Sequence, residues 1–373
     1  MRPPMFFTIL ITVLLVGCFQ TFAGEKVIRC PNPIASLHDR WTWAEHEATS
    51  RGFSNEYWIG YSIEKLMEKN SFVGSFDTDE RRNHPTLAEV IADTTLNETG
   101  KSQRYGHDII VSDGVVSLDE KKSEEKIKKE IGILFHYKSE GAEEITVSNL
   151  SLHVRLKNDP LLWLEGVKED ESITFLQTFF GDARSSDIKE KLVTAIGIHS
   201  SNVAYPFLKK IAAGSESDNV RENAVFWISQ VTTSGEAVQF LSGIAQSDRS
   251  EDVQEKAIFS LSEMNTAAAT EALISIARTD KNNELRKKAT FWLGEKASEK
   301  AVSTLKELVE DEDTEIQKSA LFALTQLPDN HGVDELIRIA KTHQNPAVRK
   351  EAIFWLGQSD DQRALDALTE IAR

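Results

Sequence analysis

The segment Ala289-Thr290-Phe291-Trp292-Leu293 is one of five similar segments in the C-terminal half of the chain, each built on the pattern Ala-x-Phe. Successive phenylalanines of these segments lie 33, 32, 31 and 32 residues apart, and they are Phe226, Phe259, Phe291, Phe322 and Phe354. A fixed period between about 20 and 50 residues is typical of a solenoid, in which each repeat packs only against its neighbours. The period predicts how this half is built, but it does not define a function.

Each repeat contains a second apolar stretch that keeps the same register. One column consists of Leu208, Leu241, Leu273, Leu305, Leu336 and Leu368, and the next consists of Ile211, Ile244, Ile276, Leu308, Ile339 and Ile371. This spacing predicts two helices per repeat, here named helix A and helix B, whose apolar faces are buried only when repeats stack. An earlier repeat begins near Ile188. The stretch from Pro160 to Phe180 is expected to be a half-repeat, because Trp163 lies 192 residues, or six repeats of 32, before Trp355.

The repeats share the pattern Val-Arg-x-x-Ala-x-x-x-Leu-Gly, followed by Ala-x-x-x-Leu-x-x-Ile-Ala. It is carried by Val220-Arg221, Ala224 and Ile228-Ser229, by Leu285-Arg286, Ala289 and Leu293-Gly294, and by Val348-Arg349, Ala352, Leu356-Gly357, Ala364, Leu368 and Ile371-Ala372. Over residues 160–373 this pattern resembles the short HEAT-like repeats of the phycobilisome-lyase type. The resemblance implies an all-α solenoid of about six helix pairs plus an N-terminal half-repeat.

The phenylalanine of helix A occupies an unusual position. On a helical wheel of about 100° per residue, Ala224 and Ile228 share the side of Val220, whereas Phe226 lies on the far side. Two interpretations remain open. The phenylalanines form an apolar stripe that binds a partner protein, a second copy or the N-terminal domain, or helix tilt buries each ring against the next repeat. Under the first interpretation, the protein-binding residues are Phe226, Phe259, Phe291, Phe322 and Phe354.

Two further columns of helix A alternate between successive repeats. The position after Phe reads Trp227, Ser260, Trp292, Ala323 and Trp355, and a second column reads Arg221, Gln254, Arg286, Gln317 and Arg349. The alternation predicts a double repeat of about 64 residues in which large and small side chains interdigitate in the core. The arginines are expected to pair with acidic residues of neighbouring turns. Charges on the B helices have mixed signs, so no electrostatic target is expected on the concave face.

Residues 24–158 are predicted to form a β-rich domain, α+β or sandwich-like, and residues 159–373 the solenoid. Expected strands are 58–63, 72–76, 109–111, 115–116, 131–137 and 145–156, the last with a bulge at Ser148-Asn149. A short helix is expected at 86–92 and a charged, exposed helix at 119–130, whereas residues 24–45 are expected to be irregular.

Composition limits the class of partner. The 373 residues include 59 acidic and 43 basic ones, which gives a net charge of −16, and 27% of residues are charged. A nucleic-acid ligand needs clustered Lys and Arg, yet the longest basic run is Arg286-Lys287-Lys288. We therefore expect a protein partner rather than a nucleic acid.

The N-terminus has the features of a targeting segment. Arg2 is the only charge before Glu25, and Met5 to Val16 is apolar but too short to span a membrane. The sequence contains two candidate processing sites. Cleavage after Ala23 would leave a soluble protein with a signal peptide at 1–23, whereas Leu15-Val16-Gly17-Cys18 resembles a lipoprotein signal, with 1–17 removed and Cys18 lipidated. Both predict a location outside the cytoplasm, in a bacterial periplasm or envelope, with membrane contact only through a lipid at Cys18.

Signals for catalysis are missing from the sequence. Cys30 remains the single cysteine after either processing event, so no internal disulfide is expected. No metal-ligand spacing, P-loop, dinucleotide fingerprint or Gly-x-Ser-x-Gly is present, and no cofactor, metal or catalytic residue is expected. His136 and His153 lie on predicted strands, where structural roles are expected.

The sequence thus favours an exported, non-catalytic scaffold or adaptor that binds a partner protein across its repeats. Two alternatives stay open. By analogy with the resembled repeats, the protein is a lyase or chaperone-lyase for a bilin or another tetrapyrrole. Otherwise it is an envelope regulator or sensor whose N-terminal domain binds a ligand.

Overall fold

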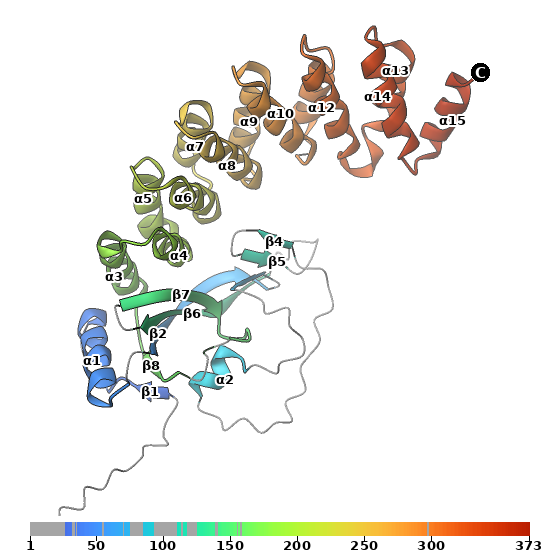
Figure 1. Cartoon of the computed structure of the whole chain (residues 1–373). Helices are drawn as coiled ribbons and strands as arrows, with labels where there is room; N and C mark the ends of the chain where they lie inside the picture. Colours follow the sequence, from blue (N-terminus) through green and yellow to red (C-terminus); the bar gives the residue numbers. More distant parts are fainter. Residues whose placement is uncertain are drawn as a thin grey trace, which may run out of the picture.

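The protein consists of a mixed β-sheet with flanking helices, followed by an array of helices that curves over it (Figure 1). The computed structural model describes residues 27–31, 34, 36–53, 56–69, 71–74, 85–92, 110–112, 115–117, 125–138, 141–154, 156, 159–296 and 298–373. The predicted signal segment and Cys18 lie outside these residues. Within them, no helix combines the length and the apolar character that a bilayer crossing requires.

The larger sheet has the strand order β1-β8-β2-β6-β7. Strand β2 pairs antiparallel with β6, and β6 pairs antiparallel with β7. Strand β8 lies between β1 and β2 and runs parallel to both. The bounds are β1 Val27–Arg29, β2 Tyr57–Glu68, β6 Lys126–Lys138, β7 Gly141–Asn149 and β8 Leu161–Leu164. This mixed sheet confirms the prediction of a β-rich N-terminal part.

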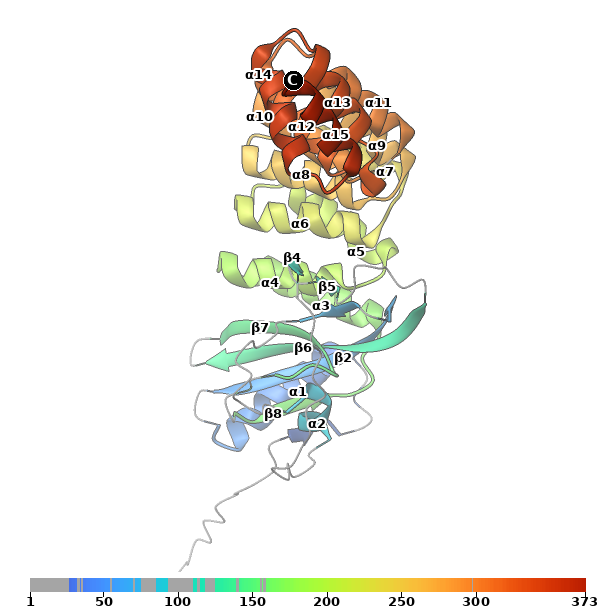
Figure 2. The same cartoon turned by 90° about the vertical axis from the view of Figure 1, so that its right-hand side faces the viewer.

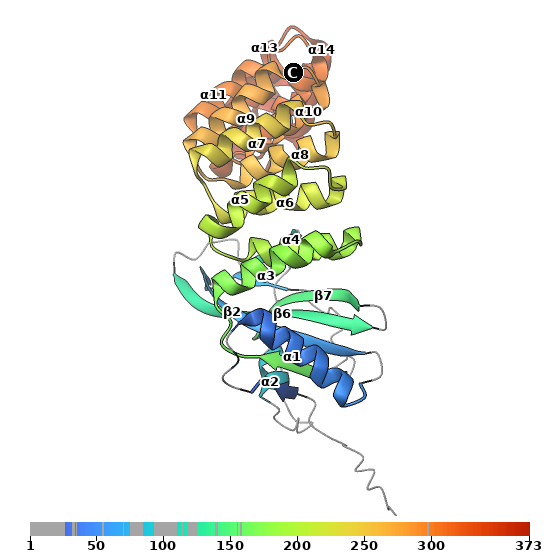
Figure 3. The same cartoon turned by 90° about the vertical axis from the view of Figure 1, so that its left-hand side faces the viewer.

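The two faces of the sheet are covered by different helices, because neighbouring residues of a strand point to opposite faces. Tyr61 faces α1 (Leu37–Ser50) and α3 (Glu169–Asp182), which lie against one face (Figure 3). Trp58 belongs to the smaller core on the other face, together with residues of α2 (Leu87–Ile91). The core on the first face continues without a break into the helical array, so the sheet and the array share one hydrophobic core.

A second, three-stranded sheet has the order β3-β5-β4, with β3 at Ser71–Val73, β4 at Ile110–Ser112 and β5 at Val115–Ser117. It lies on the side of the molecule that faces the viewer in Figure 2. These strands and α2 confirm the short strands and the short helix predicted for this part of the chain.

Three expectations for the N-terminal part are wrong, and they concern residues 24–45, the charged helix at 119–130 and the bulge at Ser148-Asn149. Residues 37–45 are helical rather than irregular, because Ser36 caps α1 and its apolar residues Leu37, Trp41, Ala44 and Ala48 recur at helical spacing and reach the sheet. The charged helix expected at 119–130 does not extend to Glu130. Residues from Lys126 onward are already strand β6, paired with the charged end of β2. Cross-strand pairing, including an ion pair between Lys128 and Glu64, overrides local helix propensity here.

The predicted bulge at Ser148-Asn149 is also wrong. Strand β7 ends at Asn149, and the register irregularity lies instead between His136 and Tyr137 of β6. Trp163 does not belong to the repeats, since it lies in β8 and pairs with Gly60. The first helix of the array, α3, begins at Glu169, ten residues after the predicted domain boundary at 158/159. That boundary stays a prediction.

The helical array contains six pairs of helices after α3. The A helices are α4 (Ser186–Gly197), α6 (Asp218–Val231), α8 (Glu251–Glu263), α10 (Asn283–Gly294), α12 (Thr314–Thr325) and α14 (Pro346–Gly357). The B helices are α5 (Ser201–Ala212), α7 (Gly235–Ser247), α9 (Ala267–Thr279), α11 (Glu299–Leu308), α13 (Val333–Thr342) and α15 (Gln362–Ile371), with a short 3₁₀ turn at Pro328–Asn330. Helix α3 completes the predicted half-repeat. The solenoid prediction is confirmed.

Two arginines of the predicted ladder fasten neighbouring repeats to each other. The side chain of Arg221, which is only 1% exposed, donates to the carbonyl oxygen of Ala212 at 3.1 Å and forms an ion pair with Asp248. Two repeats later, Arg286 makes the corresponding bonds to Ala277 and Asp311. Arg221 and Arg286 thereby each join the end of one B helix to the loop that follows the next one. Arg349 donates instead to the carbonyl oxygens of His343 and Gln344, at 2.6 and 3.0 Å.

Candidate protein-binding groove

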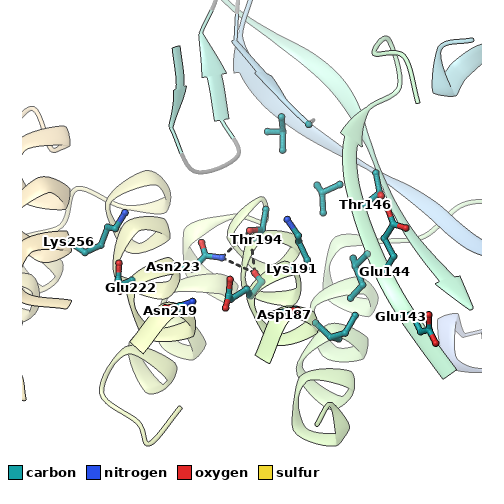
Figure 4. Close-up of a pocket in the computed structure, with 16 residues that line it drawn as sticks. Glu143, Glu144, Thr146, Asp187, Lys191, Thr194, Asn219, Glu222, Asn223 and Lys256 are labelled. Carbon is teal, nitrogen blue, oxygen red and sulfur yellow. Dashed lines mark hydrogen bonds between the residues drawn. The ribbon is translucent and has the colours of Figure 1, made fainter. Parts of the chain in front are cut away.

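A groove opens where the sheet meets the inner side of the array (Figure 4). One wall is strand β7 together with Val73 and Gly74 at the end of β3, and the other is formed by residues of α4, α6 and α8. The volume of the groove is about 510 Å³. The A helices thus line the side that faces the sheet, as Figure 1 also shows. The expectation that the concave face lacks an electrostatic target was drawn from B helices, and it is wrong because the A helices line this side.

The helical wall is built by residues at helical spacing. Asp187, Lys191 and Thr194 of α4 project into the groove, and Asn219 and Asn223 do so from α6 (Figure 4). The side-chain amide of Asn223 donates to the carbonyl oxygen of Glu190 at 2.8 Å and to the hydroxyl of Thr194 at 3.2 Å. This pair of bonds joins α6 to α4 within the helical wall of the groove.

The groove is acidic. Five carboxylates and two lysines line it, and they are Glu143, Glu144, Asp187, Glu190, Glu222, Lys191 and Lys256. Glu143 is paired with Lys138 at 3.0 Å. Within the described part of the chain, Asp187 and Glu190 form no ion pair, so their charge remains available to a ligand. The lining therefore favours a cationic ligand over an anionic one.

The five phenylalanines predicted as a protein-binding surface do not line this groove. They form a row of aromatic contacts along the array instead, in the order Trp227, Phe226, Phe259, Trp292, Phe291, Phe322, Trp355 and Phe354. Phe226 is buried, the next three phenylalanines are half-buried, and Phe354 is 53% exposed. Of the two interpretations, the structure favours packing between repeats. A binding role for these five residues stays a prediction.

The groove itself was missed. Its helical residues occupy polar positions of the A helices, and the sequence already shows Asp187, Glu190, Glu222 and Asn223 there. A polar helix surface is normally only solvated. What distinguishes the wall of a groove from such a solvated surface is the strand opposite, and the sequence does not show that β7 lies beside α4.

A second polar cluster lies at the junction between the sheet and the array. The hydroxyl of Ser172 lies 2.8 Å from Nε2 of His199 and 2.9 Å from the hydroxyl of Tyr61. All three side chains are buried. Burial lowers the pKa of His199 to about 4 and raises that of Tyr61. The cluster is closed to a substrate, and it joins β2 and α3 to the connection between α4 and α5.

The remaining site predictions concern histidine and cysteine. His136 is buried, and its Nε2 lies 3.0 Å from a carboxylate oxygen of Asp159. The backbone of His153 forms an isolated antiparallel β-bridge with that of Thr86. In the part of the chain that the structure describes, no three His, Cys, Asp or Glu side chains are placed to hold a metal ion. Cys30 is a free, buried cysteine, and burial raises its pKa.

Comparison with known proteins identifies the repeats. The family profile described as HEAT repeats matches residues 205–294, 270–331 and 302–373. Residues 205–373 are HEAT repeats. The matches begin within α5, so they cover most of the array but not α3 or α4.

Several solved structures align with part of this chain. YibA of Escherichia coli is 18% identical, with 55% of this chain and 82% of that one covered and a TM-score of 0.35. The complex of CpcE and CpcF of phycocyanin lyase from Nostoc is 18% identical, with coverages of 54% and 80% and a TM-score of 0.31. Human deoxyhypusine hydroxylase is 19% identical, with coverages of 56% and 79% and a TM-score of 0.25. No curated protein sequence matches.

Proposed function

We propose that this chain is an exported, non-catalytic scaffold or adaptor that binds a partner protein in the groove between β7 and helices α4, α6 and α8. The observation that carries the proposal is the groove itself, which brings a sheet edge and an acidic helical wall together. Stacked repeats present extended surfaces that suit binding to another protein, and here the sheet closes one end of that surface.

The chemistry of the groove supports binding rather than catalysis. Among the described residues that line it there is no histidine or cysteine, and the hydroxyl groups of this lining belong to Thr146 and Thr194. The buried serine–histidine contact at the junction cannot serve a nucleophilic mechanism in this arrangement. Ser172 is fully buried, and a histidine with a pKa of about 4 is a weak base at neutral pH.

The proposal of export rests on the apolar segment Met5 to Val16 and on the two processing sites after it. The mass of the mature protein tests it. Cleavage before Cys18 with an added lipid indicates an envelope lipoprotein, and cleavage after Ala23 indicates a soluble periplasmic protein. A mass equal to that of the full 373 residues would contradict export.

A photo-crosslinking amino acid at Asn219 tests the groove as a binding site. Asn219 is exposed and lines the groove, whereas exposed Gln246 on helix α7 is not part of its lining and serves as the control position. We expect a protein cross-link from position 219 that is absent from position 246. The cross-link should disappear in the triple variant Asp187→Lys, Glu190→Lys, Glu222→Lys. Equal products from both positions, or a product that survives the triple variant, would contradict binding in the groove.

A further inference from the structure

Strand β7 contributes its edge, rather than one of its faces, to the groove. Five consecutive residues of the strand, Glu143 to Val147, line the groove. Side chains of consecutive strand residues point alternately to opposite faces. A ligand on one face would therefore meet every second residue only. Glu143 has no partner in β6 because the register shifts there, but Glu144 to Val147 are paired in register, and contact with all four requires that the groove runs along the backbone edge.

This edge is open. Strand β7 is the last strand of its sheet, and its pairing partner is β6. The pairing register places Asn149 opposite Ile131, and the amide of Leu150 donates to the carbonyl oxygen of Glu130 at 3.0 Å. In an antiparallel pair, residues with hydrogen bonds to the partner strand alternate with residues that point away.

Extending this alternation from Leu150 assigns the backbone groups of β7. Ser148, Thr146 and Glu144 bond to β6, while the N–H and C=O groups of Ile145 and Val147 point to the groove. Among the described residues, no turn, loop or side chain bonds to these outward groups. Their side chains are buried, since Ile145 is 3% and Val147 9% exposed. The edge thus offers backbone donors and acceptors fixed in position by a packed core.

We propose that the occupant of the groove is an extended segment of a partner protein, which adds to β7 as a further strand. This inference rests on the proposed function and specifies the kind of partner. Addition of a strand supplies backbone hydrogen bonds for affinity, and alternate side chains of the added strand supply specificity. The lined edge of five residues is about 17 Å long at roughly 3.4 Å per residue, which fits a segment of about five to seven residues.

The charge of the groove predicts which residue types alternate along that segment. One set of alternate side chains on the added strand faces helices α4 and α6, where Asp187, Glu190 and Glu222 lie. Lysine or arginine at these alternate positions complements the carboxylates, whereas acidic residues are repelled. The segment therefore carries basic residues at every second position. Apolar or small residues between them point away from the carboxylates.

A lysine–valine peptide, Lys-Val-Lys-Val-Lys-Val-Lys, is the probe for this mode of binding. Its affinity is compared by fluorescence polarisation with that of the Glu-Val counterpart. Two further peptides carry N-methyl groups on either the three valine amides or the internal lysine amides. All amides of one set face β7 and all of the other set face outward, so one N-methylated peptide should bind at least about tenfold more weakly than the other. Equal affinity of the two would contradict strand addition while leaving protein binding in the groove intact.

Variants of the protein provide an independent test. Val147→Pro removes an outward N–H but no bond to β6, and proline is tolerated at such edge positions. Val147→Ala loses the packing of the side chain but keeps the N–H, so it is the matched control. We expect Val147→Pro to weaken binding of the lysine–valine peptide by about tenfold relative to Val147→Ala. Equal affinities of the two folded variants would overturn the proposal, and the N-methylated peptides decide the question on the unaltered protein if Val147→Pro does not fold.

Charge variants separate specific recognition from general attraction to an acidic protein. Asp187→Asn with Glu190→Gln should weaken lysine–valine binding by about tenfold, whereas the equally neutralising pair Glu299→Gln with Asp366→Asn on distant helices should not. Equal effects of the two pairs would show non-specific attraction and would overturn the proposal. Slower hydrogen exchange at the amides of Ile145 and Val147 upon peptide addition would support it. Unchanged exchange at both amides, with peptide bound, would reject it.

Discussion

Phe226 of α6 stacks on Phe259 of α8, with ring centroids 6.2 Å apart and ring planes inclined by 10°. The same contact recurs two repeats later between Phe291 and Phe322, at 5.8 Å and 11°. Between these stacks, a tryptophan replaces the parallel partner, since Phe259 meets Trp292 in a tilted contact at 5.1 Å. The stacking unit is therefore the double repeat that the Trp and Arg alternation predicts, and the aromatic row holds repeats together.

Phe259→Ala should lower the free energy of unfolding by about 2–3 kcal/mol, because the half-buried ring contacts both Phe226 and Trp292. Phe354→Ala should cost less than about 1 kcal/mol, because its ring is 53% exposed and meets Trp355 of its own helix. Urea denaturation followed by circular dichroism measures both. A partner that still binds Phe259→Ala with full affinity would argue against a binding role for this residue. Equal stability losses in the two variants would contradict the difference in packing.

Arg221→Ala should be among the most destabilising single changes in the array. It leaves the Asp248 carboxylate, which is 9% exposed, without its cation and the carbonyl oxygen of Ala212 without its donor. Removing one partner of a buried ion pair costs about 3–5 kcal/mol. Arg338→Ala is the control, because Arg338 is 46% exposed in its pair with Glu335 and should cost less than about 1 kcal/mol. Similar denaturation midpoints for the two variants would show that Arg221 does not fasten the repeats.

The array was predictable because its residues repeat. The columns at Leu208, Ile211 and Arg221 recur with a period that chance does not produce, and each recurrence checks the others. The half-repeat was counted correctly for a partly wrong reason. Trp163 has the spacing of a helix A residue, yet its backbone pairs in β8, since sheet pairing depends on residues distant in the sequence. The same non-local effect turned the charged stretch from Lys126 into strand β6.

The candidate site was less predictable than the fold. The wheel placed Phe226 away from the centre of its own repeat, and this is compatible with burial because the next repeat covers that side through Phe259. The groove depends on two elements, β7 and α4, that meet only in three dimensions. No local pattern marks Ile145 as an edge residue, because its alternation is that of any strand with one buried face.

Gly197→Ala should destabilise the array, whereas Gly243→Ala should stabilise it. A Cβ atom at Gly197, in the last turn of α4, would overlap the indole of Trp227 on the next A helix. A Cβ atom at Gly243, within α7, would meet nothing within 4 Å. Overpacking of this kind costs about 1–3 kcal/mol, while Gly→Ala in an unhindered helix gains about 0.5–1 kcal/mol. Thermal unfolding of the two variants should therefore shift in opposite directions, and shifts of the same sign would contradict the contact between Gly197 and Trp227.

The junction cluster should make stability depend on pH in a defined window. Burial holds the pKa of His199 at about 4 in the folded protein, below the ordinary value of 6.5, and nearby Lys65 also disfavours its protonation while Glu169 partly offsets both. Between these two values the unfolded chain binds a proton at this residue and the folded chain does not. The free energy of unfolding should therefore fall as the pH is lowered from about 6.5 to about 4, by up to roughly 3 kcal/mol, and should lose nothing from this residue above that window.

His199→Gln isolates this contribution. Glutamine can still hydrogen-bond to Ser172, but it does not titrate, so the variant should be less dependent on pH between 6.5 and 4 than the unaltered protein. Carboxyl groups are the same in both proteins, so their contributions cancel in the difference between the two curves, and that of Asp361, whose pKa is depressed to about 2, falls below this window. Urea denaturation at several pH values gives the two curves, and NMR titration of the His199 ring gives its pKa directly. Parallel curves for the two proteins, or a ring that titrates near 6.5 in the folded state, would show that His199 is not held neutral by burial between the sheet and the array.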